Sequence, residues 1–425
     1  MSGKAATLQP GVRLADYLSC GLLARICPPD KVALALAACG RQSQRQRDLP
    51  AHATAYYVMA LALYQGVNYT EVLRIVTEGM QMLGDSSVRR DVGKSGISAA
   101  RTRLGWQAMA HLADQVLTPL ADERTPGAFV SGLAKRYRLV SLDGSCLEVA
   151  DQSANAQAFG YPSTGQGRTG YPQIRFTALV ENGTHALFGI ASAGFKDSEV
   201  SLAHKTIAHL QPGMLCLADR GLSGFPLWQA ASATGAQLLW RVNKNRHLPV
   251  LKRLPDGSYL SQIEPAAATR KTMAGGAQPN QPITPIMPMT VRVIQYQLPG
   301  SLEPEPLYRL ITTLVDHQEI SAQTLARLYR ERWTIETTLA EMKTTLKGSA
   351  IVLRSKTPDL VRQEFYALVI AHYAIRKLMQ EASLGTKARG DEDSAGQGAP
   401  PDALSFKQAV STVRRKLPNY GAISP

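Results

Sequence analysis

One uninterrupted run decides the fold: Tyr329-Arg-Glu-Arg-Trp-Thr-Ile-Glu-Thr-Thr-Leu-Ala-Glu-Met-Lys-Thr-Thr-Leu-Lys347. It contains no Pro or Gly, so we expect a single helix. At about 100° per residue, four side chains then fall on one side of it, namely Tyr329, Arg332, Glu336 and Lys343. A carboxylate framed by an aromatic ring and two cations suits an anionic ligand. A surface helix stabilised by Glu–Arg and Glu–Lys pairs is the alternative.

Upstream of this helix, the pattern of apolar residues changes to that of a sheet. Strands are expected over residues 137–144, 173–180, 185–190, 213–219 and 237–242, and helices over 198–210 and 225–234. Asn182-Gly183 is typical of a hairpin turn between the second and third strands. Three antiparallel strands, a crossover helix and a fourth strand match the RNase H-like fold. The fold class is therefore α/β, with a mixed sheet flanked by helices.

Two acidic residues are predicted to end strands of this sheet. Asp143 closes the first strand and Asp219 the fourth, and these strands are neighbours in an RNase H-like sheet. The two aspartates then meet at one edge, where a packed helix brings Glu336 to them. Taken alone, each aspartate is more simply a turn or helix cap.

Three carboxylates brought together repel one another, and divalent cations relieve that repulsion. Oxygen ligands with open positions suit Mg²⁺ or Mn²⁺. Two such ions about 4 Å apart activate a hydroxyl nucleophile and stabilise the leaving oxygen of a phosphodiester. We therefore expect Asp143, Asp219 and Glu336 to be both the metal ligands and the catalytic residues.

The spacing Tyr-x2-Arg-x3-Glu-x6-Lys resembles the signature of the DDE transposases of the insertion sequence four family. Leu-Asp-Gly-Ser around Asp143 and Ala-Asp-Arg-Gly around Asp219 agree with it in order. The resemblance implies cutting of transposon ends, strand transfer into target DNA, in some members a DNA hairpin intermediate, and a homodimer on double-stranded DNA. It also implies that the helical N-terminal part binds the terminal DNA.

Several side chains are candidates for DNA contacts. Arg332 and Lys343 suit phosphates near the scissile bond, Tyr329 suits a phosphate or stacking, and Trp333 suits support of a flipped base. Further candidates are Arg220, the segment Trp240, Arg241 and Lys244, and, at a helix start, Arg101 and Arg103. Another basic stretch, Arg41-Gln-Ser-Gln-Arg-Gln-Arg47, looks like a polar linker.

Composition supports a polyanionic partner. The net charge is +14, which favours nucleic acid, and 44% hydrophobic residues suffice for globular folding. The five cysteines show no C-x2-C pair, which argues against a zinc knuckle or a disulfide framework. No signal pattern and no membrane-spanning run is found, so a cytoplasmic, nucleoid-associated bacterial protein is expected.

The predicted domains follow one another along the chain. They are a helical DNA-binding domain at 1–125, the RNase H-like core at 126–242 and 306–380, a β-rich insertion at 243–305, and a flexible linker with a short helix at 381–425. Two other functions remain possible interpretations: a catalytically silent or regulatory DNA-binding protein on the same fold, and a carboxylate-pair glycoside hydrolase. The positive charge and the 6% aromatic content argue against the hydrolase.

Overall fold

The chain forms two compact units, each built from separate stretches of sequence. Unit 1 comprises Met1–Leu120, Leu147–Ile174 and Leu339–Pro425, and unit 2 comprises Ala121–Cys146 and Arg175–Thr338. The computed structural model describes residues 14–45, 47–82, 84–85, 88, 92–164, 167–168, 170–265, 287–297, 307–348, 352–385 and 404–414. Most of the predicted helical domain, residues 1–125, thus shares a unit with residues 339–425, and the two predicted parts of the core, 126–242 and 306–380, are divided between the units.

Over its described residues, unit 1 is mainly helical and includes a small pair of strands. Its elements are α1 (Leu14–Ile26), α2 (Pro29–Ala38), α3 (Ala51–Leu63), α4 (Tyr69–Met82), α5 (Lys94–Leu104), α6 (Gln107–Val116), α7 (Ser153–Phe159), β3 (Ser163–Thr164), β4 (Gly167–Arg168), the π-helix η4 (Glu341–Leu346), α13 (Pro358–Gly385) and α14 (Phe406–Arg414). The predicted helical character of the N-terminal part is confirmed.

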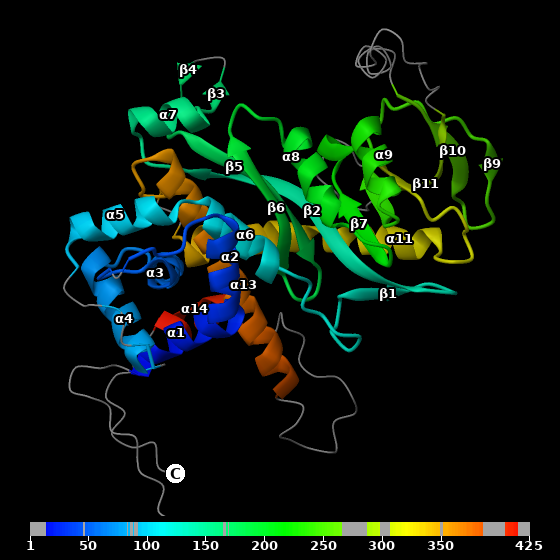
Figure 1. Ribbon diagram of the computed structural model, residues 1–425. Helices are drawn as coiled ribbons and strands as arrows, with labels where there is room; N and C mark the ends of the chain where they lie inside the picture. The colour runs from blue at the N-terminus through cyan, green and yellow to red at the C-terminus, as the bar shows by residue number, and fades with distance from the viewer. Residues whose placement is uncertain are drawn as a thin grey trace, which may run out of the picture. The chain divides into compact units, whose positions relative to one another are not determined.

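Helix α3 is the centre of unit 1. It is apolar on every side and buried from Ala53 to Leu63, as expected of a helix surrounded by others. Helix α13, far along the chain, packs against α3 and α6, and Figure 1 shows it crossing the N-terminal helices. The N-terminal helices therefore share one core with the C-terminal part of the chain.

Unit 2 is built on a mixed sheet with the order β6-β5-β2-β7-β8-β12-β11-β10-β9, and β1 pairs with β2. Its strands are β1 (Phe129–Ser131), β2 (Arg136–Glu148), β5 (Gln173–Glu181), β6 (Ala186–Gly194), β7 (Met214–Ala218), β8 (Gln237–Arg241), β9 (Lys252–Arg253), β10 (Tyr259–Ile263), β11 (Met289–Gln297) and β12 (Leu307–Thr312). The α/β class is confirmed. Strands β9 to β11 of the predicted insertion extend the sheet. Residues 266–286 and 298–305 of the insertion lie outside the described residues.

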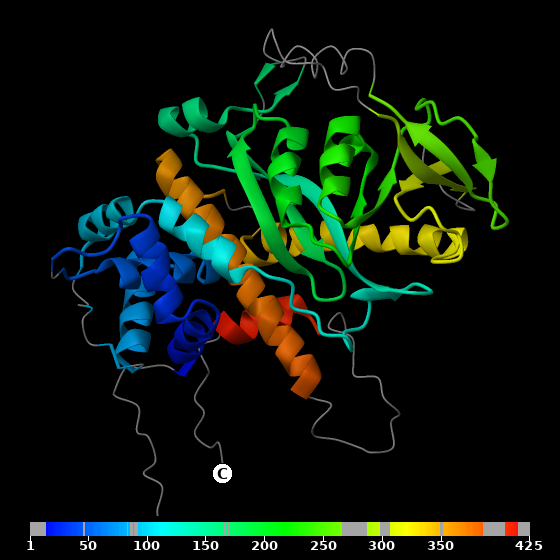
Figure 2. The ribbon, with the colours of Figure 1, turned by 45° about the vertical axis from the view of Figure 1, so that its right-hand side comes forward.

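Helices cover both faces of this sheet. On one face, α8 (Glu199–Thr206) and α9 (Phe225–Ala233) lie side by side, and Trp228 of α9 packs edge-on against Trp240 of β8. The other face carries α11 (Ala322–Leu328), followed by the 3-10 turn η3 (Tyr329–Arg332) and α12 (Trp333–Ala340), as Figure 2 shows. On that face, Leu139, Leu217 and Leu239 form one core with Leu325 and Tyr329.

We expect strand β2 to end at Asp143 from the sequence, but the strand continues past this residue. The parallel pairing of β2 with β7 stops at Leu142 and Ala218, but β2 continues to Glu148. Strand β7 stops because the carboxylate of Asp219 accepts a hydrogen bond from Gly221 N and caps the 3-10 turn η2 (Arg220–Leu222). Asp143 therefore lies beside the end of its neighbour, within a longer strand.

The run from Tyr329 to Lys347 is not one regular α-helix. It begins as η3, continues as α12 and then widens into η4. A π-helix turns less per residue than an α-helix, so the spacing of seven residues from Glu336 to Lys343 does not keep both side chains on one line. The prediction of a single face is therefore wrong beyond Ala340.

The C-terminal region differs from the predicted linker. Helix α13 extends to Gly385, and α14 packs against α1, α13 and η4 through Phe406, Val410 and Val413. Residues 386–403, expected to be a flexible linker, lie outside the described residues. Among the helices that the structure describes, none is both long and apolar enough to cross a bilayer.

Candidate active site

The end of strand β7 brings Asp143 and Asp219 together. Both follow the last paired residues of β2 and β7, Leu142 and Ala218, which lie next to each other in the sheet. Each aspartate is oriented by a nearby backbone amide: Gly144 N donates to Asp143 Oδ1 and Gly221 N to Asp219 Oδ1, both at 2.8 Å. The two acids predicted to meet therefore lie at one point of the sheet.

Arg332 links the third predicted acid to the first. Its guanidinium donates to Glu336 Oε1 at 2.8 Å and to Asp143 Oδ2 at 3.4 Å. Its side chain is only 11% exposed, whereas that of Glu336, one helical turn on, is 40% exposed. Arg332, a candidate for a phosphate contact, holds two carboxylates together here.

A fourth carboxylate belongs to this group, and the sequence analysis missed it. Glu199 is the first residue of α8, directly after Ser198, whose Oγ accepts a hydrogen bond from Ser201 N at 3.1 Å. Its side chain interacts electrostatically with both Asp143 and Asp219. The available signal was its position, because a helix that follows the third strand of such a sheet begins near the edge where the acids gather.

Close packing of Glu199 explains the glycine after Asp143. A Cβ on Gly144 would lie 2.5 Å from Glu199 Oε1, which is well inside van der Waals contact. The Asp-Gly pair was interpreted as a strand end and turn. Its glycine instead leaves room for the fourth carboxylate.

The electrostatics of the group favour a bound cation. Burial first, and then the charges of Asp219 and Glu199, raise the pKa of Asp143 to about 7, against the opposing effects of the Gly144 amide and Arg332. Burial, followed by the charge of Asp219, also raises the pKa of Glu199. These groups resist ionising together unless positive charge is supplied. An all-oxygen set of this kind has the donor chemistry that Mg²⁺ and Mn²⁺ prefer.

The carboxylates are not arranged as a preformed metal cage. Within the residues that the structure describes, no three His, Cys, Asp or Glu side chains converge closely enough to hold an ion. Two of the carboxylates, Glu336 and Asp143, are instead bonded to Arg332. The guanidinium supplies the positive charge that a divalent ion would otherwise bring, so the donors fit a metal once Glu336 exchanges partners.

Tyr329 has a structural position. It is 5% exposed, and its hydroxyl donates to Ala218 O at 3.3 Å. The prediction that it contacts DNA is therefore corrected. Its bond instead ties η3 to the end of β7, beside Asp219.

Trp333 is open to a ligand, because its side chain is 57% exposed. The guanidinium carbon of Arg332 lies 5.5 Å from the centre of its ring.

Trp240 is fully buried, so the interpretation that it lines DNA is wrong. Beside it, Arg241 lies 3.9 Å from the ring centre of Tyr308.

Arg101 requires a second correction. It was assigned to DNA from its place on a basic helix, but it is 4% exposed. Its guanidinium donates to Gln363 Oε1 and Ser355 Oγ, both at 3.0 Å. Arg103, two residues on, is exposed, and Lys343 is half-buried within η4.

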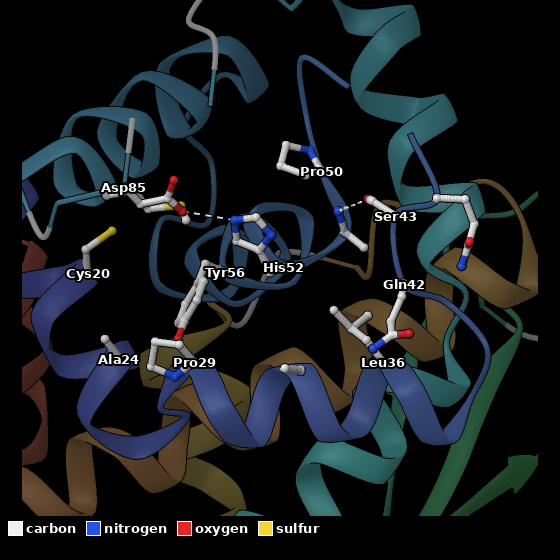
Figure 3. Close-up of a pocket in the computed structure, with 14 residues that line it drawn as sticks. Cys20, Ala24, Pro29, Leu36, Gln42, Ser43, Pro50, His52, Tyr56 and Asp85 are labelled. Carbon is white, nitrogen blue, oxygen red and sulfur yellow. Dashed lines mark hydrogen bonds and ion pairs between the residues drawn. The ribbon is translucent and has the colours of Figure 1, made fainter. Parts of the chain in front are cut away.

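Two hollows outside the carboxylate group differ in character. One, of about 840 Å³, begins at Arg220 beside Asp219 and includes Asn243, Asn245 and Arg246; Lys244, between the two asparagines, is exposed. The other, of about 670 Å³, lies in unit 1, and Figure 3 shows its mainly apolar lining. Its lining includes His52, whose Nε2 lies 2.9 Å from Asp85 Oδ2. It contains no set of carboxylates among the residues described there.

Comparisons with known proteins place the chain in a family. Residues 17–114 match the family described as insertion element 4 transposase N-terminal, and residues 134–374 match the transposase DDE domain. The chain is 25% identical over 418 residues to the transposase InsG for insertion sequence element IS4 of Escherichia coli (strain K12), covering 98% of this chain and 85% of that protein. It also resembles a solved piggyBac transposase synaptic complex with hairpin DNA, with 10% identity, a TM-score of 0.45, and coverage of 97% and 84% of the two chains.

Proposed function

Because this chain belongs to the IS4 family of DDE transposases, and is therefore a metal-dependent enzyme of DNA transposition, we propose that Asp143, Asp219 and Glu336 are its catalytic carboxylates. The observation that carries this assignment is the shared Arg332, which joins Asp143 to Glu336 while Asp219 lies beside Asp143. Three acids that are far apart in the sequence meet at one sheet edge.

The core of unit 2 is proposed to be RNase H-like. Support comes from the strand order β6-β5-β2-β7-β8, in which β2 and β7 are parallel neighbours and β7 and β8 are parallel. In this interpretation, strands β9 to β11 are the part inserted after β8. Their pairing with β12 makes the insertion continuous with the catalytic sheet.

Two Mg²⁺ or Mn²⁺ ions are proposed to be held by Asp143, Asp219 and Glu336. Such ions activate the attacking hydroxyl and neutralise charge on the scissile phosphate and its leaving oxygen. The residues prepare this site in defined ways. The amides of Gly144 and Gly221 fix Oδ1 of each aspartate. The other oxygen of Asp143 accepts a hydrogen bond from Arg332, so it becomes available to a metal only when Arg332 moves away.

Arg332 is proposed to change partners when the site is loaded. Without a metal, it neutralises Asp143 and Glu336. Once those carboxylates are neutralised by cations, its guanidinium is free to bind a DNA phosphate through a bidentate pair of hydrogen bonds. The substrate is double-stranded DNA at the transposon ends, with the target as a second duplex.

The other proposed DNA contacts surround this centre or lie in unit 1. Trp333 is exposed and suited to support an unstacked base. Arg220, Arg241, Lys244, Lys343 and Arg103 are proposed to contact phosphates. The enzyme is proposed to act as a homodimer on paired ends, which light scattering with and without end DNA would test.

The test measures nicking and DNA binding on the same preparations. Asp143→Ala, Asp219→Ala and Glu336→Ala are each expected to lose metal-dependent nicking while retaining binding in a gel shift. Glu331→Ala is the matched control, because Glu331 is exposed and lies on the same run as Glu336. Full nicking by any of the three variants would overturn the assignment, whereas binding without nicking by the wild type would favour a catalytically silent DNA-binding protein.

A further inference from the structure

A small basic recess lies in unit 1, and the catalytic chemistry makes no use of it. It has a volume of about 180 Å³ and lies between the loop that joins α2 to α3 and the end of α5. Three arginines line it: Arg41 and Arg47 of the loop, and Arg103 of the helix. The stretch interpreted from the sequence as a polar linker therefore forms one wall of a recess.

The fold brings these arginines together in a defined way. Arg41 Nη1 donates to Arg103 O at 3.3 Å. Gly105 ends α5 with a φ of +68°, and a Cβ there would lie 3.3 Å from Arg41 Nε and 3.4 Å from Arg41 Cζ. The missing side chain of Gly105 thus lets the guanidinium of Arg41 lie against the end of α5.

No carboxylate among the described residues that line the recess balances these charges. The other polar side chains lining it are neutral: Gln42, Ser43, Gln44 and Thr54. Asp48 follows Arg47 in the chain but is not one of the lining residues. Burial, and then the charge of Arg47, lowers the pKa of Arg103, so the like charges oppose one another. Elsewhere in unit 1, by contrast, Arg74 is held by Glu71 and Glu78.

We propose that Arg41, Arg47 and Arg103 form a binding site for a phosphate group of the DNA backbone. Guanidinium groups bind phosphate oxygens through paired N–H donors, and three of them would bind one or two adjacent phosphates. The recess is small and no aromatic residue lines it, so it suits a phosphate rather than a base. The choice of DNA as the source rests on the proposed function, in which DNA is the substrate.

The test uses the full-length protein without metal, so that no cleavage occurs. Binding to a fluorescent end duplex is measured by anisotropy over a series of salt concentrations. Arg41→Gln/Arg47→Gln/Arg103→Gln is expected to weaken binding at least tenfold. It is also expected to reduce the slope of log K against log salt by about 0.9 for each phosphate that the variant no longer neutralises.

Arg45→Gln is the matched control. Arg45 lies on the same loop and is exposed, but it does not line the recess, so its slope should stay close to that of the wild type. If the triple variant keeps the wild-type melting temperature and shows the same slope as Arg45→Gln, the proposal is wrong. A triple variant that melts early would be replaced by the three single variants, whose slopes are judged by the same criterion.

Two further measurements distinguish the proposed phosphate site from its alternatives. Inorganic phosphate should raise the melting temperature of the wild type and not that of the triple variant; stabilisation together with unchanged DNA binding would overturn DNA as the source. Asp143→Ala should keep the wild-type salt slope although it does not nick. If the wild type fails to nick but the triple variant still has a reduced slope, the proposed catalysis fails and the phosphate site stands.

Discussion

Glu199 lies close enough to Asp143 for its charge to raise the pKa of that aspartate, although the hairpin of β5 and β6 separates the two residues in the sequence. Two carboxyl groups so close together favour a proton on one of them. A divalent cation held by this group of carboxylates would supply positive charge in place of that proton. We therefore expect protonation of the pair and metal binding to be coupled.

The first prediction concerns stability without metal. The folded protein keeps Asp143 protonated up to about pH 7, whereas the unfolded chain ionises it near its ordinary pKa of about 4. The folded state therefore loses stability as the pH rises from about 4 to about 7, and it does not regain that stability above pH 7. In EDTA, Asp143→Asn should raise the melting temperature by a few degrees at pH 8 and leave it unchanged at pH 4. An equal rise at both pH values would assign the effect to packing.

The second prediction concerns proton release. Because a metal must displace the proton near Asp143, the apparent affinity for Mn²⁺ should increase from pH 6 to pH 8. Calorimetric titrations at pH 6 in two buffers of different ionisation enthalpy would measure the protons released. We expect release at pH 6 that declines by pH 8. Equal heats in both buffers at pH 6 would contradict the coupling.

The third prediction concerns Glu199 itself. Glu199→Gln keeps a hydrogen-bonding group but removes one negative charge, so Asp143 should ionise at a lower pH. Mn²⁺ should bind about tenfold more weakly, equivalent to about 1.4 kcal/mol. Both effects are visible in the titrations described above, and Glu199→Asp should recover part of the affinity. If neither the Mn²⁺ affinity nor the midpoint of its pH dependence changes, Glu199 does not take part in metal binding.

The fourth prediction concerns Gly144. An alanine there places a Cβ against Glu199 Oε1, so Gly144→Ala should displace Glu199, lower the melting temperature and reduce nicking. Glu199→Ala removes the obstructing side chain. The double variant should then be more stable than the sum of the single changes implies, which a double-mutant cycle measures. Strict additivity would show that the two residues do not interfere.

The fifth prediction concerns Arg332. Arg332→Ala leaves Asp143 and Glu336 without their cation, so the metal-free protein should be destabilised and Mn²⁺ should stabilise it more than it stabilises the wild type. Nicking should nevertheless be abolished, because alanine cannot hold the DNA phosphate. Arg332→Lys should restore the stability better than it restores nicking, since lysine supplies the charge without the paired donors. A variant that nicks at the wild-type rate would make Arg332 purely structural.

Much of the site could be predicted from the sequence because it depends on local patterns. Asp143 and Asp219 were found from apolar strands followed by acids, and the order of strands then placed them together. Glu336 and Arg332 were found from their spacing of one helical turn. That spacing is kept where η3 passes into α12, and the two side chains bond there.

The remaining features depend on distant segments that no local pattern reveals. Arg101 is buried because Gln363 and Ser355, more than 250 residues later in the chain, enclose it. The register of Lys343 was mispredicted because the helix widens after Ala340, and local spacing does not show that change. Glu199 looked like an ordinary first-turn acid after a serine cap. Only the neighbouring sheet edge, with Asp143 and Asp219, makes Glu199 part of the carboxylate group.

The packing of α13 on α3 also has a consequence for how the protein is made. Helix α3 (Ala51–Leu63) leaves the ribosome almost three hundred residues before α13 (Pro358–Gly385), so its apolar surface has no permanent cover during most of synthesis. The N-terminal helices thus complete their core only after translation is nearly finished. A prematurely terminated chain would retain the N-terminal basic residues but would lack a helical bundle with a complete core. It would be a substrate for chaperones and proteases rather than a competitor for transposon ends.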